Sequence, residues 1–243
     1  MFQFQKASLS YGSTRALAEM DLKIEAGEQV CLIGPSGAGK TSLLALLNGR
    51  RFPSAGEVRV EDKNLSELSP KELRIARSRI AWVPQDLGLV PNLRVNQNVA
   101  CGRVGEKGTW GLMRSFLAMP KSERDEIHGL LKRLGIGEKL YQRTDHLSGG
   151  QQQRVAVARA LFQKPKAILA DEPVSAVDPE RARDLMELLT TLAREEGLTL
   201  VASLHDLSLA RRYFDRVIGL REGEVVFDGL AGEPEVEQLY RLS

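Results

Sequence analysis

The strongest chemical pattern in the chain is the glycine-rich segment GPSGAGKT at residues 34–41. Two glycines separated by four residues, then a lysine and a hydroxyl, build a loop whose backbone N–H groups cradle phosphates. In such a loop Lys40 reaches the outer phosphates and Thr41 ligates Mg²⁺. A strand-like run, Gln29–Ile33, precedes the loop and a helical run, 42–48, follows it, so a helix N-terminus points at the bound anion. The alternative, a glycine-rich turn without a ligand, does not account for these flanks.

Two adjacent carboxylates, Asp171 and Glu172, end the apolar run AILADE. Open α/β sheets bind their ligands beyond the carboxyl ends of the strands. We therefore expect Asp171 to hold Mg²⁺ and Glu172 to take a proton from an attacking water molecule. His205 follows a second apolar run, 199–204, and should reach the same edge. The alternatives are acidic residues that cap the following helix and a histidine that is structural or exposed.

The sequence LSGGQ at residues 147–151 predicts a second helix end that can bind an anion. Ser148 and the two glycines after it precede the helical run 152–162, so they form an anion nest at a helix N-terminus. One ATP molecule would hardly use two such ends from one fold, so we expect the second to serve a neighbouring subunit. The alternative is a simple serine-capped helix start.

The remaining runs predict an α/β core with an antiparallel β layer and a helical insertion. A strand at Ile80–Val83 ends at Pro84 and Gln85, and from there to about residue 159 the periodicity is helical, with an interruption at the glycine-rich segment 102–111. The antiparallel layer beside the phosphate-loop strand is predicted from short β-patterned runs at 2–9, 21–24, 29–33 and 56–60.

The core resumes after the helical insertion. Apolar strands at 167–170 and 199–204 are separated by a helix at about 179–196, and a hairpin of 216–220 and 224–227 follows. We therefore predict one domain over residues 1–243, in which 1–84 and 160–243 form the α/β core and about 85–159 form a helical subdomain.

Composition narrows the classes of function. The formal net charge is +2, from 34 Lys and Arg against 32 Asp and Glu, which gives no strong field for nucleic acid. No apolar run has the length of a signal-peptide core or a membrane span, so any membrane role should come through a partner. Cys31 and Cys101 lack metal-ligand spacing, which favours two buried or free thiols in a reducing cytosol.

These motifs together resemble the nucleotide-binding subunits of ATP-binding cassette (ABC) transporters, and the resemblance spans essentially all 243 residues. The landmarks that carry it, in chain order, are Tyr11, GPSGAGKT at 34–41, Gln85, LSGGQ at 147–151, AILADE at 167–172, SAVD at 175–178 and His205.

The resemblance implies a P-loop NTPase (RecA-like) core and a homodimer in which two subunits pair head to tail. Each ATP would lie between one phosphate loop and the LSGGQ of the other subunit. Tyr11 would stack on adenine, Gln85 would contact Mg²⁺ and the membrane partner, and SAVD would form the subunit-contact loop. The implied catalytic residues are Glu172, His205 and Gln85, the implied Mg²⁺ ligands are Thr41, Gln85 and Asp171, and the implied ATP contacts are Tyr11, Gly34, Pro35, Ser36, Gly37, Ala38, Gly39, Lys40, Thr41, Ser42, Ser148, Gly149, Gly150, Gln151 and Asp178.

A single short cassette without fused membrane spans resembles a bacterial importer subunit. Such a subunit would lie at the cytoplasmic face of the cell membrane, bound to integral membrane permease subunits, served indirectly by a solute-binding protein, and without nucleic acid. The permease should dock in a cleft near Gln85 and the segment 91–99. The segments most similar to phosphonate importer ATPases, which predict a phosphonate, phosphite or phosphate as the solute, are 102–116, 140–161, 168–179, 203–210 and 216–229.

The alternatives to this function are another solute, a soluble ABC protein and a small-molecule kinase. The subunit could serve another solute, such as polar amino acids, or the chain could be a soluble ABC protein of DNA repair or translation. A P-loop small-molecule kinase would leave LSGGQ and His205 without a role. Within 102–116, the alternatives to a docking element are a variable surface loop, or a core position for Trp110 and Phe116.

Overall fold

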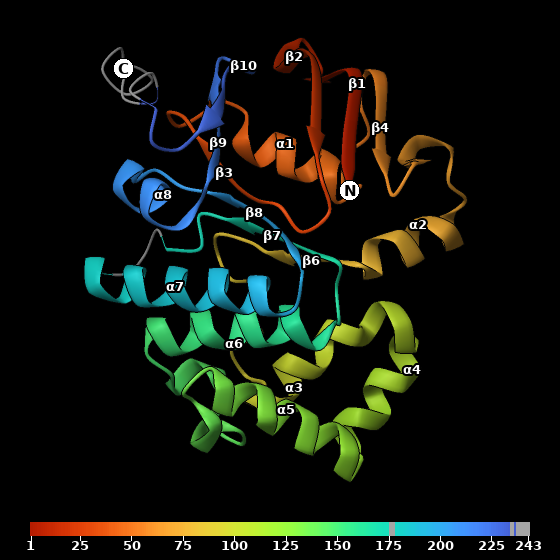
Figure 1. Ribbon diagram of the computed structural model, residues 1–243. Coiled ribbons are helices and arrows are strands. Elements are labelled where there is room, and N and C mark those ends of the chain that lie inside the picture. Colours follow the sequence, from red (N-terminus) through yellow and green to blue (C-terminus); the bar gives the residue numbers. More distant parts are fainter. Residues whose placement is uncertain (175–177, 234–235, 237–243) are drawn as a thin grey trace.

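The computed structural model describes residues 1–174, 178–233 and 236, apart from the side chain of Thr109. Its centre is a six-stranded sheet in the order β10-β9-β3-β8-β7-β6 (Figure 1). The pairs from β9 to β6 are parallel, and β10 is antiparallel to β9, so the parallel strands all end at one edge. The strands are β3 (Gln29–Ile33), β6 (Ile80–Val83), β7 (Ala167–Asp171), β8 (Thr199–Ser203), β9 (Arg216–Arg221) and β10 (Glu224–Leu230).

The expected antiparallel layer is confirmed as a second sheet in the order β2-β1-β4-β5. Strand β2 begins at Thr14, earlier than the run 21–24 predicts, because register shifts within the β1–β2 pair break the alternation of buried and exposed residues. The bounds are β1 (Phe2–Tyr11), β2 (Thr14–Ile24), β4 (Ala55–Val60) and β5 (Lys63–Asn64).

Helices cover both faces of the six-stranded sheet. Val30 and Leu32 of β3 pack toward α1 (Lys40–Leu47), which lies between the two sheets, while Cys31 and Ile33 pack toward α6 (Gly149–Phe162) and α7 (Pro179–Glu195) (Figure 1). Successive strand residues point to opposite faces, and a parallel sheet buried on both faces is apolar throughout. The helix expected at 179–196 is confirmed.

The segment between β6 and β7 is helical, and its buried residues continue the cluster on the α6–α7 face of the sheet. The interruption expected at 102–111 is confirmed over a shorter stretch: two helical segments of α4 meet at a kink, where Gly108 has φ 68 and ψ 177. The proposed subdomain boundary near 159 falls inside α6. The other helices are α2 (Pro70–Ser78), α3 (Val95–Ala100), α4 (Val104–Leu117), α5 (Lys121–Arg133) and α8 (Leu207–Tyr213), with 3₁₀ turns at Leu65–Glu67, Cys101–Arg103, Gly137–Lys139 and Thr144–His146.

In the part of the chain that the structure describes, no helix combines the length and the apolar composition of a membrane span.

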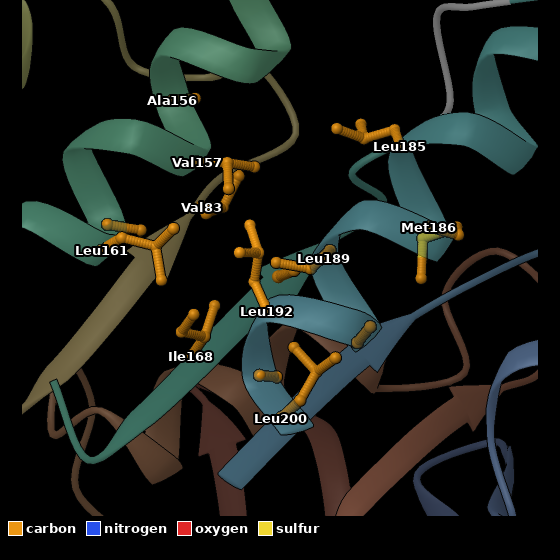
Figure 2. Packing of buried hydrophobic residues seen from close by; sticks show 14 of the residues in the cluster. Val83, Ala156, Val157, Leu161, Ile168, Leu185, Met186, Leu189, Leu192 and Leu200 are labelled. Atoms are coloured by element: carbon orange, nitrogen blue, oxygen red, sulfur yellow. The ribbon is translucent and has the colours of Figure 1, made fainter. Parts of the chain in front are cut away.

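Figure 2 shows the buried side chains through which α6 and α7 pack on the sheet. Val157 and Leu161 of α6 and Leu189 of α7 meet Ile168 of β7 in one buried cluster. Because interiors are close-packed, removing one of these side chains leaves a cavity that the neighbours fill only in part.

We predict that Leu189→Ala lowers the free energy of unfolding by about 2–5 kcal/mol, from lost burial and the cavity left behind. Urea denaturation with an unchanged m-value measures this change. Glu187→Ala, on the exposed side of the same helix, is the matched control and should change stability by about 0.5 kcal/mol or less. Equal midpoints for the two variants would contradict the packing described here.

Candidate functional site

The loop at 34–41 leaves β3 and has a backbone that only glycine accommodates at two positions. Gly34 has φ +146, and a Cβ there would lie 2.2 Å from the carbonyl oxygen of Leu220. Gly39 has φ +106, and a Cβ there would lie 2.7 Å from Cδ2 of Leu17. The first contact is on β9 and the second on β2, so the loop is held between the two sheets. It then enters α1 at Lys40, two residues before the predicted run 42–48, and Gly49 follows the helix with φ +67.

Lys40 is buried against the loop that carries it. Its Nζ donates to the carbonyl oxygens of Gly34 at 2.8 Å and Pro35 at 3.1 Å. Burial lowers the pKa of Lys40, and the charges of Glu172 and Asp171 act in the opposite direction. The predicted cation therefore lies inside the loop and near the predicted acidic pair. Other residues of this region were also predicted to contact ATP. Of these, Ser36, Gly37 and Thr41 are exposed, Ser42 is partly exposed, and Ala38 is buried.

A serine that sequence reasoning missed joins the two acidic residues. Ser203, buried at the end of β8, donates from Oγ to Oδ1 of Asp171 at 2.7 Å and accepts from the backbone N–H of Glu172 at 2.9 Å. Asp171 and Ser203 are paired in the β7–β8 register. A hydroxyl two residues before His205, at the end of a predicted buried strand, is the signal that could have identified it.

The expected meeting of Glu172 and His205 at one edge of the sheet is observed. Oε1 of Glu172 contacts Nε2 of His205, and the two residues follow the neighbouring strands β7 and β8. Glu172 has φ +47, a left-handed backbone that a non-glycine residue adopts at a cost. The bond from its N–H to Ser203 holds this conformation, which directs the carboxylate beyond the edge.

Gln85 follows β6 at the same edge, and its side chain is exposed. The turn after it is held by α6, because Arg159 donates to the carbonyl oxygens of Leu87 at 2.6 Å and Gly88 at 2.5 Å. Burial lowers the pKa of Arg159, and no ion pair of the described residues includes it. Gln85 is thus connected to the helix that begins with the second predicted anion site.

That second site, Ser148–Gln151, forms the start of α6 in a reciprocal capping arrangement. Ser148 Oγ accepts from the N–H of Gln151, and Gln151 Oε1 accepts from the N–H of Ser148 at 3.1 Å. The helix begins at Gly149, earlier than the predicted run at 152, and a Cβ at Gly149 would meet open space. α6 covers the face of the sheet opposite α1, and no hydrogen bond or ion pair of the described residues joins 148–151 to 34–41.

Two further residues that were predicted to contact ATP lie at the end of β1 and at the start of α7. Tyr11 ends β1, is 41% exposed, and lies under the guanidinium of Arg51, 5.2 Å from the ring centroid. Asp178 caps α7, where Oδ1 accepts from the N–H of Arg181 at 3.1 Å. The rest of the predicted contact loop, 175–177, lies outside the described residues.

A groove of 660 Å³ lies between α2, β6, the start of α4 and the end of α6. It differs from the expected cleft, because neither Gln85 nor 91–99 lines it; Arg159 connects it to the turn after Gln85. The indole Nε1 of Trp82 is buried and has no partner among the described residues. The lining includes four arginines and no Asp or Glu: Asn48, Arg50, Pro70, Leu73, Arg74, Arg77, Ser78, Ile80, Trp82, Cys101, Gly102, Val104, Gly105, Arg159, Ala160 and Gln163.

This chain is similar to proteins of ABC transporters both in sequence and in fold. A family profile described as ABC transporter matches residues 17–175. Phosphonates import ATP-binding protein PhnC 3 of Halalkalibacterium halodurans is 41% identical over 99% of this chain and 94% of that protein. PhnC 1 of Pseudomonas aeruginosa, with the same description, is 48% identical over 90% of this chain and 81% of that protein.

Solved structures with the same fold include cbiO1 of Clostridium perfringens, part of the ABC transporter complex cbiONQ. It has a TM-score of 0.83 and 30% identity and covers 98% of this chain and 91% of that chain. The ATP-binding cassette MJ0796, in a dimeric post-hydrolysis state bound to ADP and Pi, has a TM-score of 0.82 and 33% identity and covers 96% of this chain and 100% of that chain.

We predict that Ser203→Ala lowers the free energy of unfolding by about 1–3 kcal/mol, because the buried N–H of Glu172 and Oδ1 of Asp171 lose their partner. Thermal or urea unfolding measures the loss. Ser208→Ala, which removes an exposed hydroxyl bonded to Asp206, is the control and should change stability by about 0.5 kcal/mol or less. A stability equal to that of the parent would show that the serine bridge contributes nothing.

Proposed function

The chain belongs to the ABC transporter family, and we propose that it is the ATP-hydrolysing subunit of an importer for phosphonates or a related phosphorus oxyanion, phosphite or phosphate. The observation that carries the ATPase assignment is the common sheet edge at which the glycine loop, Asp171, Glu172 and His205 come together. The solute assignment is supported by the similarity to proteins named for phosphonate import, which covers nearly the whole chain.

We propose that the phosphates of ATP bind the N–H groups of the loop 34–41 and the ammonium of Lys40. Nζ would exchange its hydrogen bonds to Gly34 and Pro35 for bonds to phosphate oxygens. Because the ammonium group is already buried, ATP binding would not have to remove it from water. Tyr11 would stack on adenine after its contact with Arg51 is displaced.

The chemistry of the three predicted ligands fits a magnesium ion. Hydroxyl, amide and carboxylate oxygens from Thr41, Gln85 and Asp171 are the hard ligands that Mg²⁺ prefers, with phosphate oxygens completing the set. The bond from Ser203 occupies Oδ1 of Asp171, which leaves Oδ2 for the metal. Bound there, Mg²⁺ would neutralise charge on the outer phosphates.

Hydrolysis would proceed by attack of water on the γ-phosphorus, with the proton of that water passing to Glu172. The bond from the γ-phosphorus to the bridging oxygen would break, so that ADP leaves with this oxygen and inorganic phosphate forms. In the described contacts this carboxylate is paired with His205. We infer that His205 turns to the γ-phosphate when ATP is present, which frees the Glu172 oxygen for water. The left-handed backbone at Glu172 keeps the carboxylate at the edge during this exchange.

We propose a homodimer in which Ser148–Gln151 of one subunit binds the ATP held by 34–41 of the other, with Asp178 near the contact. The opposite placement of α1 and α6 on the sheet supports sharing, since each helix end would need a different subunit to reach one nucleotide. The dimeric state of MJ0796 supports a dimer.

The groove beside α2 is the proposed docking site for a permease subunit at the cytoplasmic face of the membrane. Four arginines without a carboxylate, and a buried indole N–H without a partner, favour an acidic segment with a hydrogen-bond acceptor. Arg159 lines the groove, lies on α6 and bonds to the turn after Gln85, so a displacement of Arg159 on docking would also move that turn and α6. The solute-binding protein would act on the permease, not on this chain.

We predict that Glu172→Gln lowers ATP turnover about a hundredfold to ten-thousandfold, because the amide cannot accept the proton of water. ATP binding should remain, and the trapped nucleotide should promote the dimer. Phosphate release and nucleotide titration of the purified protein measure the two effects. Unchanged turnover would remove Glu172 from the role of base.

We predict that deletion of the gene abolishes growth on low concentrations of a phosphonate or phosphite as sole phosphorus source. The test uses a strain without redundant uptake systems, and complementation by the intact gene should restore growth while a Glu172→Gln copy should not. Normal growth and uptake on phosphonate, phosphite and phosphate would contradict the solute assignment and would favour another solute, such as polar amino acids, with the ATPase assignment intact.

A further inference from the structure

A cavity of 240 Å³ lies between α7 and α8, and none of the proposed ATP contacts lines it. The two helices lie side by side on the same face of the six-stranded sheet (Figure 1). Every side chain of the lining carries a polar group, so the cavity suits a polar ligand. The lining residues are Glu187, Thr190, Thr191 and Arg194 of α7, and Arg212 and Tyr213 of α8.

Three hydrogen-bond donors of this lining have no acceptor among the described residues. The hydroxyl of Tyr213 is buried and has no hydrogen-bond partner there. The guanidinium groups of Arg194 and Arg212 belong to no ion pair of the described residues, and that of Arg212 lies 5.6 Å from the centroid of the Tyr213 ring. Buried polar groups are almost always bonded to protein, water or a ligand, so a molecule in the cavity should accept from Tyr213.

The chemistry of the lining selects an oxyanion that keeps a proton. Guanidinium and hydroxyl groups suit a tetrahedral oxyanion, because its oxygens can accept from several donors at once. Glu187 would repel a fully ionised anion but can accept a hydrogen bond from a protonated oxygen. Near neutral pH part of the phosphate or phosphonate molecules keeps such a proton, whereas sulfate does not. The lining therefore fits a small phosphorus oxyanion.

The elements around the cavity lead to the proposed ATP site. α7 begins directly after Asp178, and α8 begins two residues after His205. Gln29, the first residue of β3, donates from Nε2 to the carbonyl oxygen of Thr190 at 3.0 Å, and β3 continues into the loop 34–41. A ligand that bridges α7 and α8 would therefore act on elements that also carry residues of the ATP site.

From these contacts we infer that the cavity is a regulatory site for a small phosphorus oxyanion, held by Arg194, Arg212 and the hydroxyl of Tyr213. The bound anion joins α8 to α7 and so restrains the turn of His205 toward the γ-phosphate, which lowers ATP turnover as the anion accumulates. Inorganic phosphate from hydrolysis and an imported phosphonate are the two sources of such an anion. The effect on turnover rests on the proposed function, whereas binding of the anion does not.

The first test measures binding of inorganic phosphate, methylphosphonate and sulfate by calorimetry. The purified full chain is saturated with a nonhydrolysable ATP analogue, so that the phosphate loop is already occupied. The variants are Tyr213→Phe and Arg212→Gln, with Tyr141→Phe and Arg114→Gln, at exposed positions of the helical lobe, as matched controls. We expect the parent and the controls to bind both phosphorus oxyanions more tightly than sulfate. Affinity should fall about fivefold to tenfold in Tyr213→Phe, which loses a neutral hydrogen bond, and about tenfold or more in Arg212→Gln, which loses a charged donor.

Unfolding and ATP turnover give two further readouts. Tyr213→Phe should be as stable as the parent without the anion, because the hydroxyl has no protein partner, and the anion should raise the Tm of the parent more than that of the variant. In the parent and the controls the anion should lower kcat with little change in KM, since it does not compete with ATP for the loop 34–41. The stronger inhibitor, phosphate or methylphosphonate, identifies the source.

Three results would overturn the inference. Equal affinity in the parent and in both variants would show that the cavity holds ordered water only. Inhibition that raises KM alone would assign the anion to the phosphate loop, and binding without a fall in kcat would remove the regulatory role. Failure of the proposed function is distinguishable, because the parent would then bind the anion but show no ATP turnover with or without it.

Discussion

The parallel pairing of β3, β8, β7 and β6 is the constraint on which the candidate site depends. Parallel strands run in one direction, so the residues that follow them meet at one edge although they come from distant parts of the sequence. The glycine loop, Glu172 and His205 follow three adjacent strands of this sheet. Burial of the sheet on both faces, by α1 on one side and by α6 and α7 on the other, is what holds this register.

Strain and hydrogen bonding are combined at the centre of that edge. Glu172 has a left-handed backbone, and Ser203 stabilises it through the N–H while it also orients Asp171. Residues in rare backbone conformations persist where their surroundings over-determine them. Here the register of β7 and β8 places one hydroxyl between two acidic residues, so the acid that would bind metal and the acid that would take a proton are positioned together.

The same sheet also separates functions. α1 and α6 lie on opposite faces, which supports the proposal that the start of α1 in one subunit and the start of α6 in the other share a nucleotide. Arg159 connects α6 to the turn after Gln85 and lines the groove beside α4. The proposed ATP contacts at the start of α6 and the groove residues at its end therefore lie on one helix, which would link nucleotide binding to docking.

Local sequence was sufficient for the parts that depend on local chemistry. The glycines at 34 and 39, the helix that follows them, and the apolar strands could be predicted, because backbone freedom and periodicity act over a few residues. The predicted runs 80–83, 167–170 and 199–204 match β6, β7 and β8 to within one residue at each end. The family was predicted from the order of the motifs, whereas the proposed solute came from the similarity of longer segments, above all in the helical lobe, to phosphonate importer ATPases.

Only the tertiary structure placed Ser203 between Asp171 and Glu172, because that bridge depends on the register of two strands that lie about thirty residues apart in the chain. It also decided that Trp110 faces outward, since Leu112 and Phe116 of the same helical segment pack on the core and Ser115 bonds to α5. Pairing register and helix rotation are long-range properties, and a single sequence carries no local signal for them.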